Sequence, residues 1–203
     1  MFDISVYNNN KSTRNFYYII EKLYNKSSRA VSISFYLFLE RLAVSDQLVQ
    51  YYTQNIDCIE NNLLYLKSDN APTFSREQKF KTIQLHKCFR TIVCQKCRLK
   101  NFFVSELFYE INISICSCCD KIETRRVAES KRLQDIERLR SRIVLYRKAN
   151  PNKNIIEKTV EKDLQQPIDT VLIVGTTIKV PDIKRLITEF SRVAKARPAS
   201  TVI

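Results

Sequence analysis

The spacing of four cysteines constrains this chain more than any other feature. Cys94 and Cys97 form one C-x2-C pair, and Cys116 and Cys119 form a second pair after 18 intervening residues. This is the spacing of structural zinc sites, in which two tight turns direct four thiolates to one tetrahedral ion. Cys118 is an alternative to Cys119 as the fourth ligand. We therefore expect a zinc-binding module whose metal contributes to folding, because binding free energy at such a site is folding free energy.

The remaining composition describes a basic protein of a reducing compartment. Five of the seven cysteines lie between residues 94 and 119, and their odd number does not fit a secretory disulfide framework. No apolar run reaches the 18 or so residues of a membrane span, so we expect no membrane partner. The net charge of +13 favours acidic partners such as nucleic acid or chromatin, although a charged surface also serves solubility.

Positive charge concentrates between residues 121 and 148. Arginines and lysines alternate there with a few acids, which is the pattern of an exposed helix. Two interpretations stay open: a solvated helix face, or a surface for DNA or histone-bearing chromatin.

Hydrophobic periodicity predicts a mixed α/β fold. Helical spacing covers residues 15–25, 32–42, 155–164 and 182–195, and short apolar runs predict strands at 48–53, 81–85, 142–146 and 170–174, with another beginning at 200–203. We expect Ser12 and Thr13 to cap the first helix. The polar residues 67–80 should form a loop. The apolar side expected for the second helix consists of Phe35, Leu37, Phe38 and Leu42.

Two polar groups follow predicted strands. Gln54, Asn55, Ile56 and Asp57 come directly after the strand at 48–53, where open α/β sheets place ligands and where ordinary turns also occur. His86, the only histidine, follows the run at 81–85. A single histidine is usually structural, but His86 is the one side chain here whose ordinary pKa suits proton transfer near neutral pH.

The only glycine, Gly175, also stands at the end of a predicted strand. Thr176 and Thr177 follow it and a helix comes next. Hydroxyls and backbone N–H groups in such a turn can hold a phosphate or a ribose, although the motif is weak alone.

Four segments in this order resemble the sirtuins, the NAD-dependent protein deacylases: TQNID, QLH, the double CxxC and GTTIKVP. RLRSRIVLY and VLIVGTTIKVPDIKRL are most similar to the fungal nuclear branch that acts on histones. The resemblance implies an incomplete Rossmann-like parallel sheet with helices and an inserted zinc ribbon. Residues 1–88 and 142–203 would form the NAD-binding domain, and residues 89–141 the zinc-binding module with its basic helix.

The resemblance also implies an activity. It predicts an NAD-dependent histone or protein lysine deacetylase of the nucleus, with NAD and zinc bound, an acetylated histone or another acetyl-lysine protein as partner, and nicotinamide released. His86 matches the catalytic base, and Asn55 the residue that orients water and ribose. Leu145 and Tyr146 would pair with the substrate peptide. The NAD-contacting positions implied are Gln54, Asn55, Ile56, Asp57, Gly175, Thr176 and Thr177.

Several positions depart from the sirtuin pattern. Cys58 and Lys87 stand where the family has glycine, and Arg147-Lys148 replaces a polar or Gly-Glu pair. A sirtuin also has a glycine-rich segment ahead of these residues and further strands after them, so we expect a chain truncated at both ends. The alternative function is therefore a catalytically inactive, sirtuin-like zinc module that binds chromatin or a protein partner.

Overall fold

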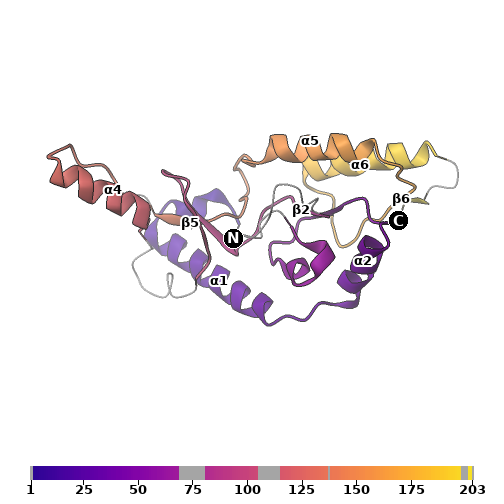
Figure 1. Ribbon diagram of the computed structural model, residues 1–203, viewed down its shortest axis with the longest axis horizontal. Coiled ribbons are helices and arrows are strands. Elements are labelled where there is room, and N and C mark those ends of the chain that lie inside the picture. The colour runs from indigo at the N-terminus through magenta and orange to yellow at the C-terminus, as the bar shows by residue number, and fades with distance from the viewer. Residues whose placement is uncertain (1, 69–80, 105–114, 137, 198–200, 203) are drawn as a thin grey trace.

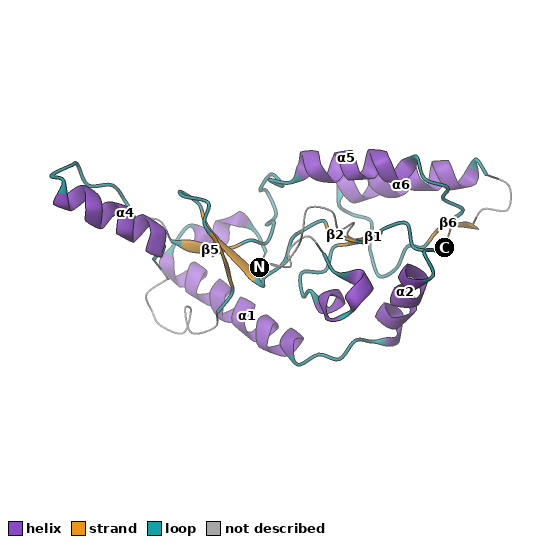
Figure 2. Ribbon diagram, in the orientation of Figure 1, coloured by secondary structure: helices purple, strands orange, loops and turns teal. Residues whose placement is uncertain are grey.

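The computed structural model describes residues 2–68, 81–104, 115–136, 138–197 and 201–202. The molecule is elongated, with α4 (Ser117–Ala128) at one end and the helix pair α5 (Lys153–Leu164) and α6 (Pro181–Lys195) toward the other (Figure 1). Short strands lie between these ends (Figure 2). Most of the loop predicted at 67–80 lies outside the described residues.

Two small parallel sheets confirm the predicted α/β class. β1 (Tyr51–Thr53) pairs with β2 (Thr82–Gln84), with Thr53 opposite Gln84. β6 (Thr170–Val171) pairs with β7 (Thr201–Val202). Because the strands of β1–β2 are parallel, residues 54–57 and His86 leave the same edge of that sheet. The strand predicted to begin at 200–203 is confirmed at Thr201 and Val202, and residues 200 and 203 lie outside the described residues.

The stretch at 170–174 differs from its prediction as a five-residue buried strand. Only its first two residues pair, and Leu172 and Val174 are 42% and 55% exposed. An apolar sequence alone therefore did not determine burial here.

A three-stranded antiparallel sheet carries the first cysteine pair. β3 (Thr91–Cys94) lies between β4 (Lys100–Phe102) and β5 (Leu139–Ser141). The strand predicted at 142–146 is wrong, because β5 ends at Ser141 and the next amides bond to three different segments. Arg142 donates to Thr91, Val144 to His86 and Tyr146 to Phe2, so no single ladder forms.

Helix α1 (Asn10–Ser28) contains the predicted helix at 15–25 but begins earlier. Its cap is Asn9, whose side chain accepts from the backbone N–H of Ser12 at 2.8 Å, so the cap predicted at Ser12 and Thr13 is wrong. The Tyr17 hydroxyl donates to the Leu139 carbonyl of β5 at 2.8 Å. The apolar residues that α1 buries are Phe16, Tyr17 and Ile20. They share one core with Phe89, Ile92 and Phe103.

Helix α2 (Ser34–Val44) is confirmed, but its buried face is not the predicted one. Tyr36, Leu39 and Ala43 are buried, whereas Leu37 and Phe38 are 45% and 47% exposed. Tyr36 meets the ring of Tyr51 on β1, with ring centroids 6.4 Å apart, so the neighbouring strand selects which apolar stripe faces inward. The described residues also contain short 3-10 helices at Ile4–Tyr7, Ile59–Asn62 and Leu64–Leu66.

Helices α5 and α6 confirm the predictions at 155–164 and 182–195 and pack over β1. The Tyr52 hydroxyl donates to the buried Asp163 carboxylate of α5 at 2.6 Å, and its ring lies 5.6 Å from Phe190 of α6. None of the helices in the described ranges combines the length and hydropathy needed to span a membrane.

The basic region at 121–148 is a helix only as far as Ala128. Residues 131–136 are irregular and β5 follows, so a single helix over this region is wrong. Glu129 and Ser130 end α4, and Ser130 takes a φ of +53°. The helical part projects from the body of the molecule (Figure 1).

Candidate functional site

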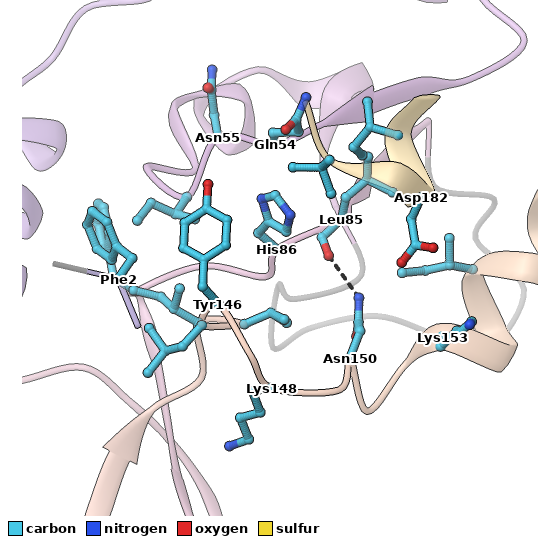
Figure 3. Close-up of a pocket in the computed structure, with 18 of the residues that line it drawn as sticks. Phe2, Gln54, Asn55, Leu85, His86, Tyr146, Lys148, Asn150, Lys153 and Asp182 are labelled. Carbon is cyan, nitrogen blue, oxygen red and sulfur yellow. Dashed lines mark hydrogen bonds between the residues drawn. The ribbon is translucent and has the colours of Figure 1, made fainter. Parts of the chain in front are cut away.

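A cavity of about 910 Å³ lies between the β1–β2 edge and the α5–α6 pair. Its lining comes from Phe2, the end of α1, residues 54–57 and 59, residues 85, 86 and 89, residues 143–150, and the facing sides of α5 and α6. His86 lies within it, between Tyr146 and Leu85 (Figure 3). Segments distant in sequence therefore build one concave surface, which is the usual form of a small-molecule site.

The backbone and the ring of His86 are both held by the segments around them. Its carbonyl accepts from the Val144 N–H at 2.9 Å, and its imidazole hydrogen-bonds to the backbone of Gln54. Burial lowers the pKa of His86 below the ordinary 6.5, because the site disfavours the charged ring, and the Gln54 contact opposes this only in part. At neutral pH the ring is therefore uncharged. One nitrogen donates to Gln54 and the other carries a lone pair that can accept a proton.

Residues 54–57 all line the same cavity as His86. The Gln54 amide donates to Thr176 Oγ1 at 2.9 Å, and the Asn55 amide donates to the Tyr36 hydroxyl at 3.2 Å. Both side chains extend away from the His86 ring in Figure 3. Asp57 Oδ1 accepts from the Ile59 N–H at 3.2 Å, which fixes the turn after β1. The turn after β1 thus places residues 54–57 in the wall of the same cavity as His86.

The Gly175–Thr177 turn is not among the residues that line the cavity. Gly175 has a φ of +65° and no atom within 4 Å of the position where a Cβ would stand, so its backbone conformation, not close packing, calls for glycine. Thr176 connects the turn to the cavity through Gln54. Thr177 is exposed.

Several residues that line the cavity are not part of any sequence motif. Asn150 donates to the Leu85 carbonyl at 2.8 Å (Figure 3), which joins the segment before α5 to the residue preceding His86. Lys148, Lys153 and Asp182 also line the cavity. Asn150 precedes Pro151, a turn signal, but nothing in the sequence indicates that this turn meets Leu85.

The four predicted cysteines converge in the antiparallel sheet region. Their sulfur atoms all lie within 4.8 Å of one another, with Cys94 3.6 Å from Cys119 and Cys97 3.5 Å from Cys116. A tetrahedral ion with Zn–S bonds of about 2.3 Å places its sulfurs about 3.8 Å apart, so the donor set fits zinc. Cys118 is not part of the cluster.

Solved structures share this fold. A complex described as Sir2 with a p53 peptide and NAD+ superposes with a TM-score of 0.68 at 15% identity, over 100% of this chain and 68% of the other. A Sir2 homolog–NAD complex gives 0.66 at 16% identity, over 95% and 60% of the two chains. At such low identity the likeness concerns the fold.

Curated relatives are closer in sequence. The NAD-dependent protein deacetylase hst4 of Schizosaccharomyces pombe is 34% identical over 197 residues, which cover 94% of this chain and 46% of that protein. The protein of the same name from Emericella nidulans is 31% identical, over 97% and 33%. The NAD-dependent histone deacetylase HST4 of Saccharomyces cerevisiae is 30% identical, over 94% and 53%. This chain thus spans between a third and about half of these relatives.

The Sir2 family profile matches residues 2–182, which include the cavity's polar group, His86, all four clustered cysteines and Gly175. The match therefore extends over both the cavity and the metal-type cluster. On this evidence the chain belongs to the Sir2 family.

Proposed function

We propose that this chain acts in NAD-dependent deacetylation of lysine side chains on proteins, histones in particular. The observation that carries the proposal is the burial of His86 in a cavity that it shares with Gln54, Asn55 and Asp57, where burial lowers the pKa of the imidazole. Membership of the Sir2 family and relatives named as NAD-dependent deacetylases support the same reaction.

Each residue has a distinct role in this proposal. NAD supplies the ribose that takes over the acetyl group while nicotinamide leaves. His86 accepts the proton of a ribose hydroxyl through its free nitrogen lone pair. Gln54 and Asn55 hold the ribose and a water molecule, and Ile56 and Asp57 line the nicotinamide pocket. Thr176, bonded to Gln54, connects the Gly175–Thr177 turn to the nucleotide.

Cys94, Cys97, Cys116 and Cys119 would hold a structural zinc ion, because four thiolates leave no coordination position open for substrate. The division into an NAD-binding domain, residues 1–88 and 142–203, and a zinc-binding module, residues 89–141, belongs to the same proposal. A histone substrate also places the protein in the nucleus.

The proposal is tested with the purified chain, NAD and an acetylated histone peptide, by following nicotinamide release. We expect release only with the acetylated peptide and a loss of about a hundredfold or more in His86→Ala. Lys131→Ala, on the exposed surface beyond α4, is the matched control and should retain the wild-type rate. Calorimetry that detects no NAD binding to wild-type protein would overturn the proposal.

One observation favours a second function, in which the chain is an inactive module that binds chromatin or another acidic partner. Helix α4 projects from the body of the molecule (Figure 1). The exposed basic residues of this helix and of the residues after it are Lys121, Arg125, Lys131 and Arg132. Nucleosome binding that weakens steeply with salt, without any turnover, would support this function. Turnover that depends on His86 would exclude inactivity.

A further inference from the structure

Two cysteines outside the metal-type cluster lie next to each other behind the cavity wall. Cys58 is 0% exposed and Cys88 is 1% exposed. Cys58 Sγ lies 3.9 Å from the Ile56 carbonyl oxygen and 3.3 Å from Gln84 Nε2, and the Cys58 and Cys88 thiols are close enough to shift each other's pKa. Neither thiol is assigned a role by the proposed deacetylation or by the zinc site.

The two thiols belong to the two segments that carry the catalytic group. Cys58 directly follows Asp57, and Cys88 comes two residues after His86. A backbone hydrogen bond of 3.3 Å from Phe89 N–H to the Ile56 carbonyl already holds these segments together. Asp57 and Phe89 line the cavity, so each cysteine is the direct sequence neighbour of a cavity-lining residue.

The surroundings make the two thiols unequal. The hydrogen bond from Cys58 lowers the pKa of Cys88, and the same bond raises the pKa of Cys58. A backbone contact with Arg90 also lowers the pKa of Cys88. Cys88 is therefore the more acidic of the two thiols, although burial opposes its ionisation, and a thiolate is the nucleophilic form of cysteine.

The backbone at Cys58 is strained. Its φ of +57° lies in the left-handed region, which costs a side chain with a Cβ about 1 kcal/mol or more. Lys87, beside Cys88, has a φ of +58°. Strained residues persist where the surrounding structure over-determines them, and they gather at functional sites.

We propose that Cys58 and Cys88 form a redox modification site, in which hydrogen peroxide converts the pair to a disulfide that distorts the cavity. The Cys88 thiolate attacks one peroxide oxygen, the O–O bond breaks, and the departing hydroxide takes up a proton as water. The Cys58 sulfur then attacks the resulting Cys88 sulfenic acid, the S–O bond breaks, and a second water leaves with the Cys58 proton. Two thiols lose two electrons, and peroxide is reduced to two waters.

The cavity responds because the new bond is short. A disulfide holds its sulfurs about 2.05 Å apart, closer than any hydrogen-bonded pair of sulfur atoms, so the segments after β1 and β2 must shift toward each other. His86 and Asp57 are carried by those segments. A misplacement of about 1 Å at a catalytic group can cost about a hundredfold in rate. This consequence for rate rests on the proposed deacetylation, whereas formation of the disulfide does not.

The first measurement maps the linkage. Zinc-loaded protein is treated with hydrogen peroxide, free thiols are blocked with N-ethylmaleimide, and the unreduced digest is examined by mass spectrometry. We expect a Cys58–Cys88 linked peptide that disappears with dithiothreitol, is absent from Cys58→Gly and persists in Cys118→Ser. Glycine suits the left-handed φ at position 58, so this variant should fold. Linkages confined to the four clustered cysteines, accompanied by zinc release, would overturn the proposal.

The second measurement reads the cavity without any turnover. His86 is the only histidine, so its imidazole gives a single NMR signal in histidine-labelled protein. Peroxide should shift this signal in wild type and in Cys118→Ser but leave it in place in Cys58→Gly, and dithiothreitol should reverse the shift. A mapped disulfide with an unmoved signal would contradict the distortion of the cavity.

The third measurement separates this proposal from the proposed function. Oxidised wild type should release nicotinamide at least tenfold more slowly than reduced protein, and Cys58→Gly should show no such loss. If the reduced protein releases no nicotinamide, the proposed deacetylation is refuted. The linkage and NMR measurements then test the redox site by themselves. Turnover that is equal in the reduced and fully linked protein would refute the redox effect alone.

Discussion

The cysteine cluster and the cavity are built in opposite ways. The cluster draws its four sulfurs from the end of β3, the turn after it and the start of α4, all within residues 94–119. The cavity draws its walls from residues near the N-terminus to α6. The cysteine cluster is formed by one short stretch of chain whose four thiols can bind a metal ion. The cavity exists only when distant helices and loops pack together.

The cluster and the cavity therefore depend on different sources of stability. The cluster packs against the core of Phe16 and Ile92, but four thiolates in one small space repel one another unless an ion binds them, so we attribute its largest source of stability to zinc. The cavity depends on buried contacts such as that of Tyr52 with Asp163 and Phe190, which lie outside its lining.

Loss of a clustered thiol should have the largest effect. Cys119→Ser leaves three thiolates, and structural zinc binding in small domains is worth about 10–16 kcal/mol. We expect loss of zinc, measured with a chromogenic chelator, and loss of the cooperative thermal transition followed by circular dichroism. Cys118→Ser is the matched control and should retain one zinc per chain. Zinc loss from Cys118→Ser, with retention by Cys119→Ser, would show that the fourth ligand is wrongly identified.

Truncation of the core beside the cluster comes next. Phe16 on α1 is 2% exposed and packs in the core that includes Ile92 and Cys94. Phe16→Ala should lower the free energy of unfolding by about 3–5 kcal/mol in urea titrations. Tyr18→Ala, on the exposed side of the same helix, should change it by less than about 0.5 kcal/mol. Equal effects of the two substitutions would mean that α1 does not support the cluster.

Loss of one buried hydrogen bond on the cavity side of the molecule should have a smaller effect on stability. Tyr52→Phe removes the 2.6 Å hydrogen bond to Asp163, which is 2% exposed, so a buried carboxylate loses one donor. We expect a loss of about 1–3 kcal/mol in the free energy of unfolding, with zinc retained. Tyr65→Phe, at a ring that is 50% exposed, serves as the control. Release of zinc from Tyr52→Phe would show that the two regions are not independent.

Titration of His86 should give the smallest effect. Burial lowers its pKa below 6.5, so at pH values between the folded and the ordinary pKa the unfolded chain binds more protons than the folded chain. Stability should therefore rise with pH through this window and level off above about 6.5. NMR titration of the single imidazole checks the pKa, and His86→Gln should abolish this part of the pH dependence. A pKa above 6.5 would contradict burial as the dominant cause.

Much of the fold followed from pattern, and the errors have physical reasons. Helices α1, α5 and α6 were predicted because one apolar stripe at helical spacing dominates each. Helix α2 offered two apolar stripes, and contact of Tyr36 with Tyr51 selected the unexpected one. Residues 142–146 look like a strand, but their amides pair with three segments that no local pattern identifies.

The sequence by itself determined which groups can do chemistry: four thiols at metal-ligand spacing, one histidine and one polar group after a strand. Residue type and short spacing suffice for these, because a CxxC turn or the end of a strand is local geometry. Only the tertiary structure decided that Cys119 rather than Cys118 joins the cluster, that Asn150 meets Leu85, and that Cys58 lies against Cys88. Such contacts join segments far apart in the chain or depend on the direction of a side chain, and packing of the whole molecule fixes both.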